Sequence, residues 1–318
     1  MPILYLGLGG TIACTLGDDG LVRATRGAGT LLAEVGSPPD VTAEDMGLGA
    51  SSDLGFDDLL ALAARLERAF GQEGFTGSVI TQGTDTIEEV AYTLHLLRRW
   101  PCPVVISGAM RHADLPGRDG PANLLDALAV ARSPEAAQLG VLVVMGGEIH
   151  GAAAVTKSHA QSPATFRSPD WGPLGLVAER QVLIARRPPP PLLLPATRID
   201  ARVNLLRIVL DTDPALVEAA LKADGLVLEG MGGGHLPARL APLLEEAVAQ
   251  GSVVAVTSRT GSGPSLRRTY GAVGAESDLR GRGILLADGP GLKVRIRLTL
   301  ALSLTPRPDL AAVAAAWL

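Results

Sequence analysis

The sequence contains few cysteines and few aromatic residues. Two cysteines occur among 318 residues, and Cys14 and Cys102 match neither a metal-binding spacing nor a disulfide framework. We expect both to be small buried or half-buried side chains in a reducing compartment. Phe, Trp and Tyr together make up 3% of the chain. The core must therefore consist mainly of Ala, Val, Leu and Ile, which is typical of helices packed on parallel strands that are buried on both faces.

Excess positive charge, a long apolar run and a signal sequence are also missing. The formal net charge is −5, so we expect no basic surface that would recruit nucleic acid or an anionic membrane. No stretch reaches the ~18 apolar residues of a membrane span. Residues 1–6 contain no basic segment and lead directly into glycines, unlike a secretory signal peptide. The sequence predicts a soluble cytoplasmic protein with no nucleic-acid or membrane partner.

Short apolar runs alternate with amphipathic segments through the first half of the chain. Leu59, Leu62 and Leu66 recur at helical spacing. The same reading predicts strands at 3–8, 78–81, 104–107 and 139–145, and helices at 57–70, 86–99 and 121–132. This order favours an α/β fold in which a mostly parallel sheet with right-handed crossovers is flanked by helices.

A proline-rich segment divides the chain. Four successive prolines at 188–191, with Pro195 close behind, exclude a helix or a central strand there. We therefore predict a larger N-terminal α/β catalytic domain at 1–186, a linker at 187–200 and a smaller C-terminal α/β domain at 201–318. In the latter, strands are predicted at 203–210, 225–229 and 253–257, and helices at 214–222 and 240–250. The segment 292–304 is ambiguous, because its apolar residues alternate as in a strand.

Polar residues and glycines follow the predicted strands of the first half. In open α/β sheets, ligands bind at the carboxyl ends of the strands. These ends read Gly-Gly-Thr at 9–11, Gln-Gly-Thr-Asp-Thr at 82–86, Gly-Ala-Met-Arg at 108–111 and Gly-Gly-Glu at 146–148. They offer hydroxyls, a carboxylate, and glycines whose backbone a ligand can approach.

Each polar residue at these ends also has an ordinary structural interpretation. Thr11 follows two glycines, where threonine commonly caps a helix or supports a turn. Thr84 or Asp85 could cap the helix that begins near residue 86, with Glu88 completing the cap. Lys157 follows a strand-like segment at 152–156 and could be a solvated lysine. His235 could be an ordinary loop histidine.

Together the same residues suit acyl transfer. A threonine hydroxyl such as that of Thr11 is a poor nucleophile until a base takes its proton. A lysine held beside a carboxylate, as Lys157 and Asp85 could be, can pass protons through a second hydroxyl such as that of Thr84. Backbone N–H groups at glycine-rich strand ends can stabilise the oxyanion of a tetrahedral intermediate. This chemistry uses no catalytic cysteine or histidine, and we expect no cofactor and no metal.

Nucleotide binding is the competing interpretation of the glycines. In a dinucleotide-binding G-x-G-x-x-G motif that begins at Gly7, the third glycine would fall at Ile12, which blocks close approach of helix and strand. The glycines at 230–234 fail likewise, since their third motif position is His235. A G-x-x-x-x-G-K-[ST] loop is absent from the sequence. We therefore set nucleotide binding aside.

Several motifs together resemble the bacterial-type L-asparaginase (asparaginase/glutaminase) family. They occur in the family's order and at similar spacing, over nearly the whole chain and more weakly after the linker. They are Gly-Gly-Thr-Ile-Ala at 9–13, Thr-Gln-Gly-Thr-Asp-Thr at 81–86, Ser-Gly-Ala-Met-Arg at 107–111, Asp-Gly-Pro-Ala-Asn-Leu at 119–124 and Thr-Lys at 156–157. The resemblance implies hydrolysis of L-asparagine to L-aspartate and ammonia through a covalent acyl-enzyme.

The resemblance also implies catalytic roles for four residues. Thr11 matches the primary nucleophile. Thr84 matches the second catalytic threonine, and Asp85 and Lys157 match the proton-relay pair. Asp85 additionally matches the carboxylate that meets the α-ammonium group of the substrate.

Five substrate-binding residues follow from the same resemblance. Ser51 would hold the α-carboxylate, the Ala109 carbonyl would lie near the side-chain amide, and a neighbouring subunit would lend Glu276 to the α-ammonium. Ser52 and Gly83 complete the set. Similar enzymes form homotetramers, so we expect a homodimer or homotetramer with active sites at the subunit interface. The resemblance also implies a helix, rather than a strand, over 292–304.

The chain departs from the family at several positions. Gln82 stands where histidine is usual, and Ser52 where enzymes that also take glutamine often have glutamine. Asparagines are common where this chain has Gly233 and His235. The tyrosine of the N-terminal loop is missing between residues 14 and 30, where the polar candidates are Thr15, Arg23, Thr25 and Arg26. Two alternatives therefore stay open: an amidase acting on L-glutamine, D-asparagine or a capped peptide amide, and a catalytically inactive amino-acid-binding protein.

Overall fold

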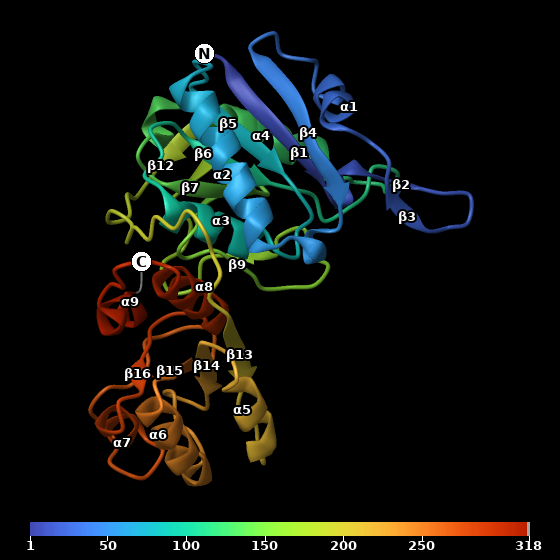
Figure 1. Ribbon diagram of the computed structural model, residues 1–318. Coiled ribbons are helices and arrows are strands. Elements are labelled where there is room, and N and C mark those ends of the chain that lie inside the picture. Colours follow the sequence, from blue (N-terminus) through green and yellow to red (C-terminus); the bar gives the residue numbers. More distant parts are fainter. Residues whose placement is uncertain (317–318) are drawn as a thin grey trace. The chain divides into compact units, whose positions relative to one another are not determined.

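The computed structural model describes residues 1–316, apart from the side chain of Leu48. The chain divides into two compact units, Met1–Leu193 and Leu194–Leu318 (Figure 1). Residues 187–200 contain no helix or strand. The domain boundaries drawn at 186 and 201 stay predictions.

Unit 1 is built on an eight-stranded sheet with the order β12-β11-β8-β7-β6-β5-β1-β4. Five neighbouring strands are parallel: β4 (Val41–Gly49), β1 (Ile3–Gly9), β5 (Gly77–Thr81), β6 (Val104–Ser107) and β7 (Val141–Met145). Three antiparallel strands extend the sheet beyond β7: β8 (Glu148–Gly151), β11 (Gly175–Ala178) and β12 (Gln181–Ile184). The predicted fold class, a mostly parallel sheet flanked by helices, is confirmed.

Helices cover both faces of this sheet. α1 (Ala28–Glu34) and α4 (Gly120–Arg132) pack against one face, and α3 (Ile87–Leu97) packs against the other beside α2 (Phe56–Gly71) (Figure 1). Helix α2 follows the periodicity read from the sequence, since Leu59, Leu62 and Leu66 are buried. The acidic residues of its first turn and Arg68 in its last turn complement the helix dipole.

The strand order reverses direction at β1. From β1 the chain passes to β4 on one side of it, and then returns through α2 to β5 on the other side. Such a switch leaves a crevice at the carboxyl ends of the two central strands, where ligands of open α/β sheets bind. Thr11 follows β1 and Thr84 follows β5, so both lie at this end of the sheet.

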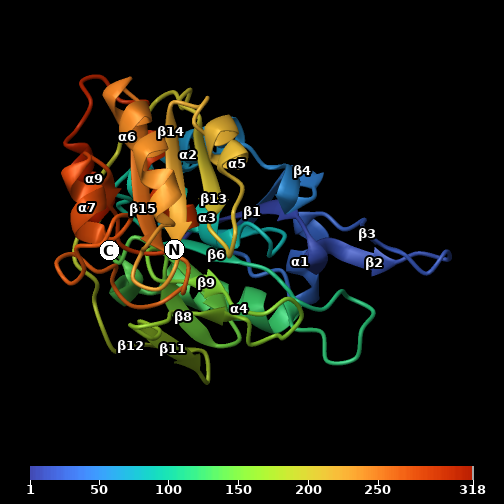
Figure 2. The same ribbon diagram turned by 90° about the horizontal axis from the view of Figure 1, so that it is seen from below.

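Two small antiparallel ribbons stand outside the main sheet. One joins β2 (Cys14–Leu16) and β3 (Val22–Ala24), and it projects away from the rest of unit 1 in both views (Figures 1 and 2). The other joins β9 (Thr156–Lys157) and β10 (Phe166–Arg167). A strand predicted over 152–156 is wrong. Residues 152–154 form a turn in which Gly151 O accepts two backbone hydrogen bonds, and extended structure begins only at Thr156.

Unit 2 is a smaller α/β layer structure, as predicted. Its parallel sheet has the order β13 (Val203–Arg207), β14 (Gly225–Gly230), β15 (Val253–Ser258) and β16 (Leu285–Leu286). One face packs against α5 (Pro214–Ala220), α6 (Ala241–Ala249) and α7 (Glu276–Gly281). The strands also contact α8 (Gly291–Leu302) and α9 (Leu310–Ala315).

The ambiguous segment 292–304 is helical over Gly291–Leu302, as the family resemblance implies. Its period-two pattern was a poor guide, because ten of the twelve residues of α8 are buried, Lys293 and Arg297 among them. A helix buried on all sides can carry apolar residues at any spacing, so alternation does not distinguish it from a strand. Within residues 1–316, α8 and the other helices are too short or too polar to cross a bilayer.

Candidate active site

Close backbone packing brings three strand ends of unit 1 together. Gly10 follows β1 with φ +81, and a methyl group placed on it would lie 2.1 Å from the Gly83 backbone N. A methyl group on Gly83 would lie 2.6 Å from Ser51 Oγ. Only glycine permits this approach, so Gly10 and Gly83 set the ends of β1 and β5 against the turn after β4. Thr11 is therefore held beside the segment that carries Thr84.

Thr11 does not cap a helix. It is the first residue of a short 3-10 turn, Thr11–Ala13, whose N-cap is Gly10 and which has no side-chain cap. The Thr11 side chain is half-buried, and its hydroxyl has no hydrogen-bond partner among residues 1–316. The structural interpretation of Thr11 is thus wrong, and the hydroxyl is available to a ligand. Its role as nucleophile stays a prediction.

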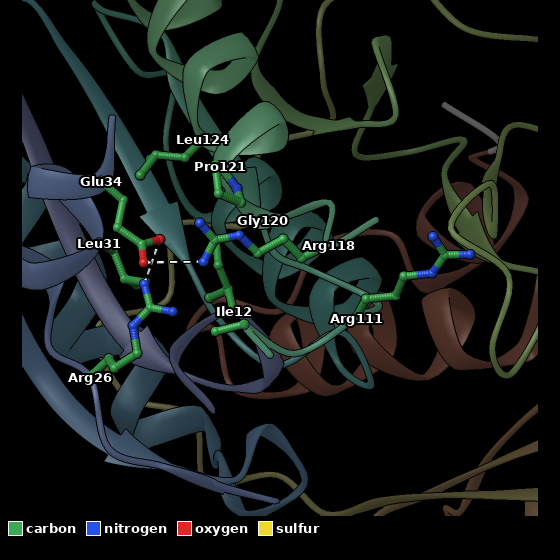
Figure 3. Close-up of a pocket in the computed structure, with 10 residues that line it drawn as sticks. Ile12, Arg26, Leu31, Glu34, Arg111, Arg118, Gly120, Pro121 and Leu124 are labelled. Atoms are coloured by element: carbon green, nitrogen blue, oxygen red, sulfur yellow. Dashed lines mark hydrogen bonds and ion pairs between the residues drawn. The ribbon is translucent and has the colours of Figure 1, made fainter. Parts of the chain in front are cut away.

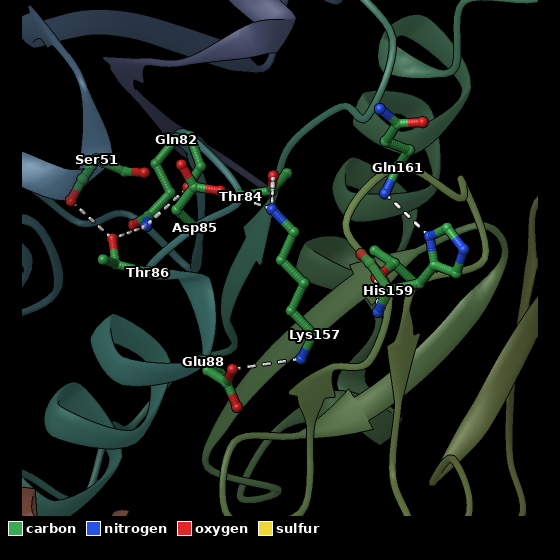
Figure 4. Close-up of polar contacts among 11 residues, drawn as sticks. Ser51, Gln82, Thr84, Asp85, Thr86, Glu88, Lys157, His159 and Gln161 are labelled. Atoms are coloured by element: carbon green, nitrogen blue, oxygen red, sulfur yellow. Dashed lines mark hydrogen bonds and ion pairs between the residues drawn. The ribbon is translucent and has the colours of Figure 1, made fainter. Parts of the chain in front are cut away.

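Lys157 joins the two polar residues that follow β5. Its Nζ donates to Thr84 Oγ1 at 2.9 Å and to Asp85 Oδ1 at 2.6 Å (Figure 4). The lysine side chain is 16% exposed, so the solvated interpretation is wrong. The capping interpretation of Thr84 and Asp85 is wrong as well, because the N-cap of α3 is Thr86 and no side chain caps it. Lys157 occupies one of the two acceptor lone pairs of the Thr84 oxygen, so the Thr84 hydroxyl proton points to a third group.

Gln82 links the end of β5 to the turn that holds Ser51. The Gln82 side chain is fully buried, and its Nε2 donates to Thr86 Oγ1 and to Gly83 O, each at 3.3 Å. Thr86 Oγ1 in turn donates to Ser51 O at 3.0 Å. Ser51 is 5% exposed, whereas Ser52 is exposed. Gln82 therefore acts here as a structural bridge for which hydrogen bonding, not titration, is required.

A second bridge holds the ends of β6 and β7 through two residues of the 119–124 motif, to which the sequence alone assigned no role. Ala109 is fully buried, and the carboxylate of Asp119 accepts the next two backbone N–H groups at 2.9 Å each. Asn123 Nδ2 donates to Gly108 O, and Asn123 Oδ1 accepts from the backbone N of Gly146, both at 3.0 Å. The signal was present, since Asp119 and Asn123 are spaced by four residues at the start of a predicted helix.

Glu276 lies in unit 2, at the start of α7, and its carboxylate is engaged within that unit. Oε1 accepts the backbone N–H groups of Thr269 and Tyr270, and Oε2 lies 3.2 Å from His235 Nε2. Burial opposes ionisation, but the hydrogen bonds, first that from Tyr270, outweigh it and hold the pKa of Glu276 below its usual range. His235 packs its ring edge-on against Tyr270, so it is more than a loop histidine. Contact of Glu276 with a ligand stays a prediction.

The ribbon that follows Thr11 carries no tyrosine, but two hydroxyls meet on it. Thr15 Oγ1 and Thr25 Oγ1 are 2.8 Å apart. At its base, Arg26 pairs with Glu34, which also pairs with Arg118 (Figure 3). The cavity beside these groups has a volume of about 10 Å³. This is room for one water, and it cannot hold an amino acid.

Metal ligands are not grouped at these strand ends. Among residues 1–316, no three His, Cys, Asp or Glu side chains are arranged so that they could hold a metal ion.

Comparison with known proteins covers both units. The family model "Asparaginase, N-terminal" matches residues 2–190, and "Glutaminase/Asparaginase C-terminal domain" matches residues 202–313. An L-asparaginase of Bacillus licheniformis is 32% identical over 301 residues, 93% of each chain. A glutaminase-asparaginase of Pseudomonas fluorescens biotype A is 32% identical over 285 residues, 82% of this chain and 76% of the relative. The crystal structure of a probable cytoplasmic L-asparaginase from Campylobacter jejuni superimposes with a TM-score of 0.86 and 29% identity, covering 98% of each chain. The chain therefore belongs to the asparaginase/glutaminase family of amidohydrolases.

Proposed function

We propose that this enzyme hydrolyses L-asparagine to L-aspartate and ammonia, with Thr11 as its nucleophile. One observation carries the proposal: Lys157 is held by Thr84 and Asp85 at the strand ends where Thr11 presents an unpaired hydroxyl. The relatives named L-asparaginase support the choice of substrate.

The reaction then has two steps. Thr11 Oγ attacks the side-chain amide carbon, its proton is removed, and a tetrahedral intermediate forms. Backbone N–H groups at the glycine-rich strand ends stabilise the oxyanion. The C–N bond then breaks, and the amide nitrogen leaves as ammonia with the proton taken from the Thr11 hydroxyl, which yields an aspartyl ester on Thr11. Water, activated through the Thr84 hydroxyl and Lys157, attacks the ester and releases L-aspartate with the Thr11 hydroxyl restored.

The second carboxylate oxygen of Asp85 suits a substrate ammonium group. Oδ1 binds Lys157, whereas Oδ2 has no partner within residues 1–316, and the side chain is 71% exposed. We assign the α-carboxylate to Ser51 and the amide end to Ala109. Ser52 and Gly83 would contact the backbone groups of the ligand. Because the substrate is a zwitterion, the net charge of −5 costs little in binding.

L-Glutamine is the second candidate substrate. The glutaminase-asparaginase relative favours it, since it shares 32% identity with this chain, as the Bacillus licheniformis asparaginase does, although over 285 rather than 301 residues. Ser52 argues against L-glutamine as a substrate, because the short serine side chain makes fewer contacts with a ligand than a glutamine side chain at this position would. The ratio of the rates of ammonia release from L-asparagine and from L-glutamine decides between the two substrates.

We also propose that the enzyme is a cytoplasmic homodimer or homotetramer, in which a neighbouring subunit lends Glu276 to each site. Two free cysteines and similarity to a protein named as probably cytoplasmic support the compartment. The assembly rests on the family resemblance. Sedimentation of the purified protein would give the number of subunits.

Ammonia release from L-asparagine, L-glutamine and D-asparagine tests the proposal. We expect release from L-asparagine in the unmodified protein, none from Thr11→Ala, and normal release from Thr76→Ala, which removes a hydroxyl from an exposed residue elsewhere in unit 1. A Thr11→Ala variant with near-normal turnover would exclude Thr11 as nucleophile. Calorimetric binding of L-aspartate without ammonia release from any amide would favour the binding-protein alternative.

A further inference from the structure

Lys157 lies on a segment that the main sheet does not hold. Its strand, β9, has two residues, and within the described chain it pairs only with β10, which also has two. The loop between them closes on itself, since the Ser158 backbone N and Oγ both donate to Thr165 O. This ribbon needs an anchor elsewhere if Nζ of Lys157 is to stay at its two partners.

Glu88 supplies a contact of that kind. It lies in the first turn of α3 and is 7% exposed. Its Oε1 accepts the Lys157 backbone N–H at 3.4 Å (Figure 4). Its Oε2 is buried and has no hydrogen-bond partner among residues 1–316. A buried carboxylate with an unpaired oxygen is costly, so its presence at this position calls for an explanation.

We propose that Glu88 is a positioning residue for Lys157. The short segment that begins α3 then holds the lysine at two points: Asp85 binds Nζ, and Glu88 binds the backbone N–H of the same residue. Because α3 is packed on the main sheet, it transfers the rigidity of the sheet to the ribbon. The negative charge of the Glu88 carboxylate is also stabilised by the dipole of α3, because Glu88 lies in the first turn of that helix.

Capping, the interpretation of Glu88 read from the sequence, does not account for this geometry. The N-cap of α3 is Thr86, and no side-chain cap is formed. A cap would aim the carboxylate back at its own helix, whereas Glu88 reaches a residue 69 positions away. Glu88 touches neither Nζ nor, in this proposal, the substrate. Its effect on catalysis runs through Lys157 and rests on the proposed function.

Two substitutions separate positioning from general stability. Glu88→Gln keeps an oxygen acceptor of the same reach, whereas Glu88→Met keeps the length and removes the acceptor. Glu67→Gln is the control, since it removes a carboxylate of unit 1 that pairs with Arg98. For each protein, hydrogen exchange at the Lys157 amide and the kcat and KM of ammonia release from L-asparagine would be measured, with thermal unfolding to verify folding.

We expect Glu88→Met to accelerate exchange at the Lys157 amide about tenfold or more and to lower kcat about tenfold or more, with a smaller change in KM. Glu88→Gln should restore both to within about threefold, and Glu67→Gln should change neither. Folded Glu88→Met with unchanged exchange at Lys157 overturns the proposal. If the unmodified protein releases no ammonia from any amide, the proposed function fails, and the exchange measurement alone decides whether Glu88 positions Lys157.

Discussion

At the scale of single residues, Lys157 has the sharpest consequence. Its ammonium group bridges Thr84 and Asp85 and is largely removed from water. Lys157→Met keeps the length of the side chain and removes its ammonium group. The Thr84 hydroxyl then loses the group that donates a hydrogen bond to it. We expect kcat to fall about 10²- to 10⁴-fold, the usual contribution of a positioned acid or base. Steady-state kinetics check this, and loss confined to KM would argue for a binding role alone.

His150 gives a prediction about stability and pH. It is fully buried on β8, where its Nδ1 and Ser168 Oγ share a hydrogen bond of 3.0 Å. Burial, and then the charge of Arg167, lower the pKa of His150 from 6.5 to about 4, although Glu148 Oε2 lies 3.3 Å from Nε2 and favours the protonated ring. Between these two values the unfolded chain takes up a proton that the folded chain refuses. The stability contributed by neutral His150 is therefore complete above pH 6.5 and is lost as the pH falls toward 4.

His150→Gln should remove this dependence. The free energy of unfolding of the variant minus that of the unmodified protein should rise by roughly 2 kcal/mol when the pH is lowered from about 7.5 to about 5. Urea unfolding at both pH values checks this, and the comparison with the unmodified protein cancels the other titrating groups. An unchanged difference between the two proteins would mean that His150 titrates normally.

At the scale of elements, Gly10 sets the ends of β1 and β5 together. Gly10→Ala would push a methyl group to 2.1 Å from the Gly83 backbone N, at a φ of +81 that side chains rarely adopt. We expect the free energy of unfolding to fall by about 3 kcal/mol or more, since neither backbone can move without disturbing Thr11 or Thr84. Gly29→Ala in α1 is the control, because its methyl group meets nothing within 4 Å. Equal melting temperatures for the two variants would contradict the close packing.

Helices and strands could be predicted from the sequence where the spacing of apolar residues along a short segment distinguishes the two. The amphipathic spacing of α2 and the apolar runs of β5, β6 and β7 correspond closely to the observed elements. The turn at 152–154 was misread because its small apolar residues pack without being extended. Helix α8 was ambiguous because burial on all sides erases the periodicity that marks a helix.

At the scale of the whole molecule, the proposed shared site predicts complementation. If each site takes Thr11 from one chain and Glu276 from another, then Thr11→Ala and Glu276→Gln chains are each inactive alone. A mixed dimer of the two regains one intact site of its two. Random mixing of subunits in a symmetric dimer then restores roughly a quarter of full activity. Co-expression of the two chains with an ammonia assay checks this, and persistent inactivity of the mixture would argue that each chain builds its site alone.

The amino-acid sequence was enough to infer the alternation of helices and strands from α2 to β7, the glycines and hydroxyls at the strand ends, and the family. These follow from local periodicity, turn chemistry and motif order, which need no knowledge of distant contacts. Tertiary structure alone decided that Lys157 reaches back to Thr84 and Asp85, that Glu88 contacts the Lys157 backbone, and that Glu276 is engaged within its own unit. Such pairings join residues far apart in the chain, and their distances depend on how the strand ends pack, which no local pattern encodes.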